Sequence, residues 1–189
     1  MPSEPRRPAA RPELGATVRA WATCSRPAFV LVPMAVALEL AAFGAMPEQV
    51  PRHVRFAGPP DAWWSRDSWL GFSAGMTVFF AAMILVGGVL LTISPSGFRL
   101  RDKEATRYWT REENWPLMRQ RLWLLIAWLA GLFAIYLALS LGVFALAPSW
   151  GLPHWANLAV MVGGLVAGAS WLFVSIRRLT TLPGRGARR

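Results

Sequence analysis

The sequence has a single cysteine, Cys24, among 189 residues. A disulfide needs two thiols, so none can form within the chain, and a disulfide-stabilised secreted scaffold is excluded. Histidine is nearly as scarce, with only His53 and His154. Even with Asp61 or Glu48 added, two histidines on separate segments fall short of a zinc site with defined ligands, so no metal is predicted.

Recognised catalytic motifs are also missing. The chain has no H-E-x-x-H, no Walker sequence, no G-x-S-x-G and no paired carboxylates at helical spacing in an apolar segment. We therefore expect a protein that is not an enzyme and that has no cofactor.

Hydrophobic residues are abundant, at 54% of the chain, and they gather in four long blocks: residues 28–46, 69–93, 122–147 and 155–176. Each block is close to or above the roughly 20 residues with which a helix crosses about 30 Å of hydrocarbon. The continuous run FFAAMILVGGVLL lacks the alternation of a membrane β-strand. The sequence thus predicts an all-α integral membrane protein with four transmembrane helices.

The net charge of +10 is distributed unevenly. Seventeen of the twenty Lys and Arg residues lie in residues 1–27, in the segment 94–121 or in the tail 177–189. Because positive residues favour the cytoplasmic side, both termini should be cytoplasmic and the loop 50–69 should be outside. The basic flanks then favour anionic lipid of the bilayer rather than nucleic acid as a partner.

This pattern divides the chain into a disordered basic arm with a possible interfacial segment (1–27), a four-helix domain (28–176) and a basic cytoplasmic tail (177–189). A cleaved signal peptide is the alternative for the first block. Glu39 inside that block and the lack of a clear A-x-A site argue against it.

The segment 94–121 should be more than a tether, because it is amphipathic and strongly charged. Thr110 and Glu113 have the spacing of a capping box. Pro116 suits the first turn of a helix that continues into the third block. Tyr108 and Trp109 would then lie against the inner membrane surface.

Tryptophans and small residues suggest how the helices are placed. Most tryptophans fall at block ends, as in an aromatic belt, and Trp128 should pack between helices. The belt residues would be Trp63, Trp64, Trp69, Trp115, Trp123, Trp150, Trp155 and Trp171. Small residues four apart allow helices to approach closely, within this chain or in a homo-oligomer, and packing within the chain is favoured. These packing residues are Gly71, Gly75, Gly164 and Gly168.

Glu39 is the ionisable carboxyl inside a predicted span. A charge there costs about 2.5 kcal/mol or more, so such residues are usually paired or functional. Glu39 could line an ion or proton pathway. It could instead be protonated, or reach Arg52, Ser73 or Thr77.

The loop 50–69 carries, in order, Pro51, His53, Gly58, Pro60, Asp61, Trp63, Ser65 and Arg66. These residues resemble the loop signature of a bacterial membrane-domain family of uncharacterised function. That domain also forms the N-terminal part of immunity proteins against a sporulation-delaying peptide toxin. The resemblance covers about residues 32–147 and implies a multi-pass protein of the bacterial inner (plasma) membrane. It implies no activity.

Two functions from different classes follow. In the first, a structured outer loop binds a ligand or a partner membrane protein or peptide, in immunity or sensing, through His53, Gly58, Asp61, Trp63 and Arg66. In the second, the chain is a small transporter or channel subunit that uses Glu39. A lipid-modifying enzyme with His53 as its base is a third interpretation and would yield a chemical product.

Overall fold

The computed structural model describes residues 14–53, 62–147, 149–153 and 155–181, without the side chains of residues 14 and 53. These ranges form mostly helix. The helices are α1 Leu14–Cys24, α2 Arg26–Phe43, α3 Arg66–Leu91, α4 Lys103–Trp109, α5 Trp115–Leu146 and α6 Trp155–Thr180, and Pro95–Gly97 is a 3₁₀ turn. The strands are β1 Gln49–His53 and β2 Ala62–Ser65. Four helices, α2, α3, α5 and α6, are long and apolar enough to cross a membrane, which confirms the predicted architecture.

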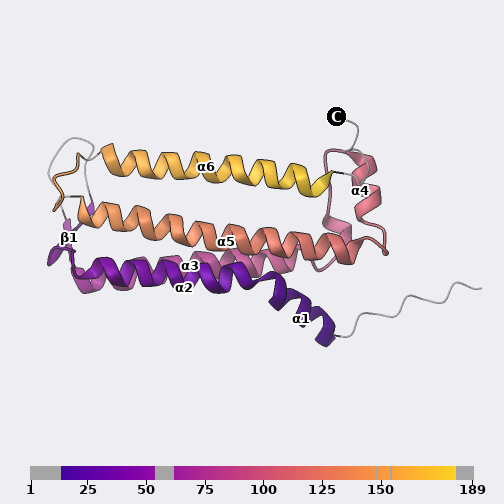
Figure 1. Ribbon diagram of the computed structural model, residues 1–189, viewed down its shortest axis with the longest axis horizontal. Helices are drawn as coiled ribbons and strands as arrows, with labels where there is room; N and C mark the ends of the chain where they lie inside the picture. Colours follow the sequence, from indigo (N-terminus) through magenta and orange to yellow (C-terminus); the bar gives the residue numbers. More distant parts are fainter. Residues whose placement is uncertain (1–13, 54–61, 148, 154, 182–189) are drawn as a thin grey trace, which may run out of the picture.

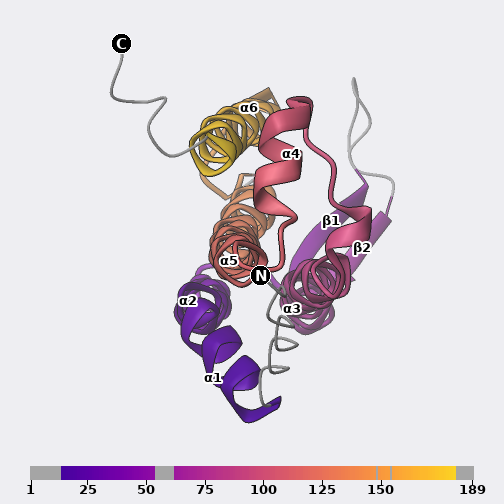
Figure 2. The same ribbon diagram turned by 90° about the vertical axis from the view of Figure 1, so that its right-hand side faces the viewer.

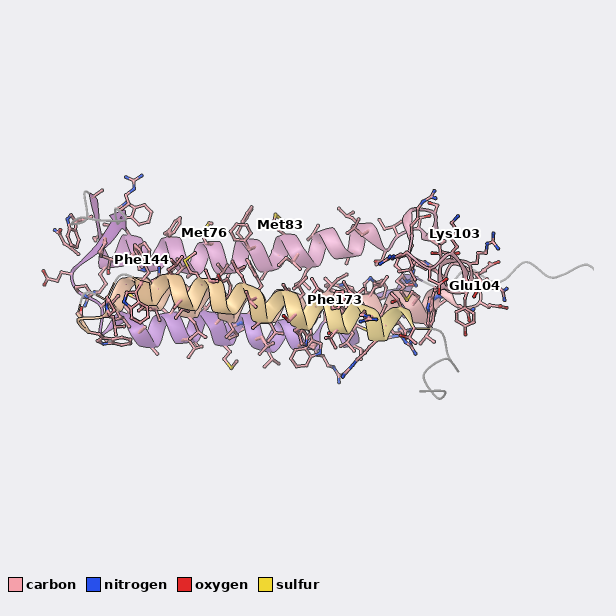
Figure 3. All side chains as sticks on the ribbon, turned by 90° about the horizontal axis from the view of Figure 1, so that it is seen from above. Met76, Met83, Lys103, Glu104, Phe144 and Phe173 are labelled. Atoms are coloured by element: carbon pink, nitrogen blue, oxygen red, sulfur yellow. The ribbon has the colours of Figure 1, made fainter. Side chains whose placement is uncertain are left out.

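The four long helices run side by side (Figure 1). Helices α2, α3 and α5 form a packed trio, and α6 packs on α5 on the side away from α2 (Figure 2). The β1–β2 hairpin lies at one end of the bundle, which we call the hairpin end. Helices α1 and α4 and the last turns of α6 lie at the other end, which we call the α4 end. Lys103 and Glu104 at the α4 end and Phe144 at the hairpin end mark the two in Figure 3.

The positions where helices begin and end depend more on local residues, such as proline and arginine, than on the limits of the apolar blocks. Helix α5 begins at Trp115 with Pro116 in its first turn, as predicted, because proline lacks the donor that the first turn leaves unused. It therefore starts seven residues before the apolar block. Helix α6 continues to Thr180, where Arg177 and Arg178 in the last turn favour the negative end of the helix dipole.

The basic arm is not wholly irregular, because helix α1 covers its residues Leu14–Cys24. Residues 1–13 and 182–189 lie outside the described ranges.

The predicted capping box at Thr110 is wrong. Thr110 is the C-cap of α4, and the helix that follows it, α5, has Asn114 as its N-cap. Helix α4 itself is capped by Asp102, whose carboxylate accepts from the backbone N–H of Glu104 at 2.8 Å. Glu113 instead lies 3.8 Å from Arg111 in an exposed ion pair. The T-x-x-E spacing alone does not distinguish the residue that precedes a helix from the residue that ends one.

Alanine and glycine bring the trio together. Ala35, Ala81, Ala134 and Ala138 form one buried cluster, and Ala28, Ala127 and Ala130 form another. A Cβ added at Gly131 would lie 2.7 Å from the Leu31 Cβ on α2. Small side chains thus allow the close backbone approach typical of membrane helices.

The four glycines predicted to pack between helices differ in what surrounds them. Gly164 of α6 faces the Tyr136 ring of α5, which an added Cβ would overlap. An added Cβ at Gly71, Gly75 or Gly168 would meet nothing within 4 Å, so packing within the chain is wrong for these three. The α5–α6 contact is completed by the Tyr136 hydroxyl, which donates to the Met161 carbonyl at 3.0 Å.

Several tryptophans differ in exposure from the prediction. Trp69, Trp115 and Trp123 are buried rather than belt residues, and Trp128 is 42% exposed rather than packed between helices. Trp109 is buried too, in a cluster with Ala105, Trp115 and Met118, so it does not lie against the membrane surface. Position along a helix predicts depth in the membrane, but rotation about the helix axis decides what a side chain meets.

Candidate functional site

The loop between α2 and α3 folds into an antiparallel hairpin. Its pairs are Gln49 with Ser65, Val50 with Trp64, Pro51 with Trp63 and His53 with Ala62, with an irregularity between Pro51 and His53. Val50 is buried, Trp64 is half-buried and Trp63 is exposed. Val50 and Trp64 thus face the helices and Trp63 lies on the opposite side of β2, although Pro51, which pairs with Trp63, is also buried.

An aromatic cluster fixes the hairpin to the helix ends. Met46, Val50, Trp69, Ala145 and Leu146 form a buried core, and Trp64 and Phe144 pack against it. Trp69 stacks on Phe144 of α5 with ring centroids 5.3 Å apart, and Trp64 meets Trp69 at 5.9 Å. Such ring pairs contribute beyond the area they bury. The hairpin is thus part of the folded core.

Two arginines of the hairpin end stack on aromatic rings. The Arg52 guanidinium lies 5.2 Å from the Trp64 ring centroid, and that of Arg66 lies 4.5 Å from Phe43. The attraction of a cation to a ring face places the Arg52 charge over the cluster and the Arg66 charge over the last residue of α2. The predicted alternative, in which Arg52 reaches Glu39, is wrong.

The predicted binding residues are placed only in part. Trp63 is 49% exposed on β2, and Arg66 begins α3 directly after that strand. The backbone of His53 pairs with Ala62 and so lies on the strand beside Trp63. Gly58, Asp61 and the side chain of His53 lie outside what the structure describes.

Glu39 is 2% exposed, on α2. Its Oε1 accepts a hydrogen bond from the Thr77 hydroxyl of α3 at 2.8 Å, one of the partners predicted for it. Ser73, one turn away on α3, also approaches the carboxyl, while its hydroxyl donates to the Leu70 carbonyl at 3.2 Å. Glu39 Oε2 is buried with no partner among the described residues.

At the α4 end, two arginine side chains also lie over aromatic rings. Arg121 lies over Trp109, and Arg119 lies over Trp123, whose Nε1 donates to the Thr92 hydroxyl at 2.7 Å.

Partial burial raises the pKa of the Cys24 thiol at the end of α1. That thiol therefore stays neutral at pH 7, which makes it a poor nucleophile.

Within the described ranges, no three His, Cys, Asp or Glu side chains gather as metal ligands would. Protein-family models, curated proteins and solved structures all give no match to the chain. The fold therefore defines the class on its own: a multi-pass membrane protein with four apolar spans. Any function has to be argued from the hairpin end and from Glu39.

Proposed function

We propose that the chain is a non-enzymatic protein of a bacterial plasma membrane that binds an extracellular ligand or partner at its hairpin end. The distribution of charge supports this orientation. Among the described residues, Arg52 and Arg66 are the cations of the hairpin end. At the other end, α1 carries Arg19, residues 94–121 carry seven Lys and Arg residues, and the last turn of α6 carries Arg177 and Arg178. An excess of Lys and Arg marks the cytoplasmic side.

The observation that carries the proposal is a pair of strands packed on the helix ends, with the large side chain of Trp63 half exposed. A plain connector between two helices needs neither a strand ladder nor a buried core of its own. Here the ladder and the Trp64–Trp69–Phe144 contacts hold Trp63 in place while half of it stays exposed. Preorganised tryptophans of this kind are common anchors of binding interfaces.

The resemblance noted from the sequence supports the same surface. The residues that carry it include Pro51, His53, Trp63 and Arg66, which lie on the two strands or directly after them. It links the surface to immunity against a peptide or to sensing. In that role the ligand is a peptide or a partner membrane protein.

A second candidate, a transporter or channel subunit, is favoured by one observation: a buried carboxyl with one unpartnered oxygen inside a span. Functional carboxyls in membranes commonly line ion or proton pathways. Glu39→Gln should abolish flux if this candidate is correct. It should leave ligand capture at the hairpin unchanged if the first candidate is correct.

Site-specific photocrosslinking tests the first candidate. A photoreactive benzophenone amino acid replaces Trp63, and Trp150 is the matched control because it is an exposed tryptophan that follows α5 at the hairpin end. After irradiation of native membranes, position 63 should give one discrete adduct of higher mass that position 150 does not give. Only diffuse lipid adducts at both positions would contradict the proposal.

A further inference from the structure

The Glu39 carboxyl lies in a layer of its own between two apolar clusters. On α2 it lies between Ala35 of the alanine cluster and Ala42 beside the hairpin core. On α3, Ser73 and Thr77 occupy the same level between Trp69 and Ala81. A carboxyl and two hydroxyls thus lie between two mainly apolar clusters, in which the buried Trp69 Nε1 has no described partner.

Among the described residues, no opposite charge faces this layer from the elements packed around it. Helix α3 has no titratable residue from Ser68 to Leu91. Helix α5 has only Tyr136 between Leu122 and Leu146, and its hydroxyl donates to α6. The other charged residue of α2 is Arg26, at its far end.

The charged residues of the hairpin end lie elsewhere. Arg52 and Arg66 lie over the Trp64 and Phe43 rings. Glu48 and Asp67 are exposed. In the described part of the chain, the carboxyl thus has no cation to compensate a negative charge.

We propose that Glu39 binds a proton in the folded protein at neutral pH and is a specific site of reaction for hydrophobic carbodiimides. An unpaired carboxylate in an apolar interior is far less stable than a neutral acid. Oε1 accepts from Thr77, so the proton resides on the unpartnered Oε2. The inference concerns the site of the second candidate function but does not require transport.

A metal cation fits the layer less well than a proton does. Hard cations take several oxygen ligands. Besides the carboxyl, the described side chains of the layer offer two hydroxyl oxygens, those of Thr77 and Ser73, which is fewer than a hard cation takes.

The reaction is an addition. The carboxyl proton passes to one nitrogen of the carbodiimide, and the carboxylate oxygen bonds to its central carbon. The acyl group then moves from oxygen to nitrogen, which leaves a stable N-acylurea. Nothing departs, so the protein gains the mass of one reagent molecule. The reaction needs a protonated carboxyl and a reagent that partitions into hydrocarbon, and Glu39 meets both conditions.

The test treats the purified full-length protein in lipid vesicles with dicyclohexylcarbodiimide from about pH 6 to about pH 9, followed by mass spectrometry of the intact chain and its peptides. We expect one adduct, at Glu39, that is absent from Glu39→Gln. Its rate should fall about tenfold per pH unit once the carboxyl ionises. Exposed Glu48 is the matched carboxyl and should react only with a water-soluble carbodiimide.

Three results would overturn the inference. They are no adduct at Glu39, an equal rate with the water-soluble reagent, and protection by sodium at constant ionic strength, which would reveal a bound cation. Peptide mapping of the wild-type chain decides the location even if a variant does not fold. None of these results depends on adducts at Trp63.

Discussion

Replacement of Trp69 by alanine should destabilise the hairpin end strongly. Trp69 is 4% exposed and contacts three rings, those of Phe144 at 5.3 Å and of Trp64 and Phe72 at 5.9 Å. Truncation of a buried Trp to Ala typically costs about 3–5 kcal/mol. The buried Trp69 Nε1 has no described partner, so no hydrogen bond is lost. We therefore expect a loss near the lower end, about 3 kcal/mol.

The measurement is unfolding of the purified protein by SDS in mixed micelles, followed by far-UV circular dichroism. Trp63→Ala is the matched control, since it removes the same side chain from an exposed position of the same hairpin and should cost within about 0.5 kcal/mol. Trp69→Phe keeps one ring and should be milder than Trp69→Ala. Hydrogen exchange in residues 49–53 should also accelerate in Trp69→Ala. Equal losses for Trp69→Ala and Trp63→Ala would refute the inference that the hairpin shares the helix core.

Two further substitutions test the helix contacts. Gly131→Ala places a methyl group 2.7 Å from the Leu31 Cβ and should cost about 1–3 kcal/mol of stability. The control is Gly142→Ala on the same helix, where the space is open. Equal stability of the two variants in the same SDS titration would argue against the close approach of α2 and α5. Trp123→Phe removes the donor to the Thr92 hydroxyl and should cost about 0.5–1.5 kcal/mol. The double variant with Thr92→Val should then lose less than the sum of the two single changes, and strict additivity would contradict that hydrogen bond.

The spans could be predicted because hydrocarbon imposes a length and excludes charge. Residues 69–93 and 155–176 lie close to α3 and α6 for this reason. Pro116 added a boundary that hydropathy hides, since charged residues occupy the first turns of α5. Local motifs were weaker, because the T-x-x-E spacing at Thr110 predicted the start of a helix where α4 ends.

The hairpin could not be predicted as strands. β1 and β2 are short, one contains a proline, and their register depends on the core beneath them. Whether a tryptophan such as Trp69 or Trp128 meets lipid or protein depends on helix rotation, which a continuously apolar sequence does not specify. The close contact between Gly131 and Leu31 could not be predicted either, because no sequence pattern indicates it.

For Glu39, part of the environment could be predicted from the sequence and part could not. Its presence in an apolar block identified it as a candidate, and Thr77 and Ser73 were among the expected partners because they are the nearby hydroxyls of α3. Its unpartnered Oε2 could not be foreseen, because it depends on where Arg52 and Arg66 are held by aromatic rings.

Native mass spectrometry of the complex, extracted gently from its own membrane, tests the binding role of the hairpin end most directly. We predict that the wild-type chain carries a second protein or peptide in stoichiometric amount and that Trp63→Ala loses it while remaining folded. Trp150→Ala, the exposed control, should retain it. A chain that is alone in both forms, or a partner that Trp63→Ala retains in full, would contradict the proposal.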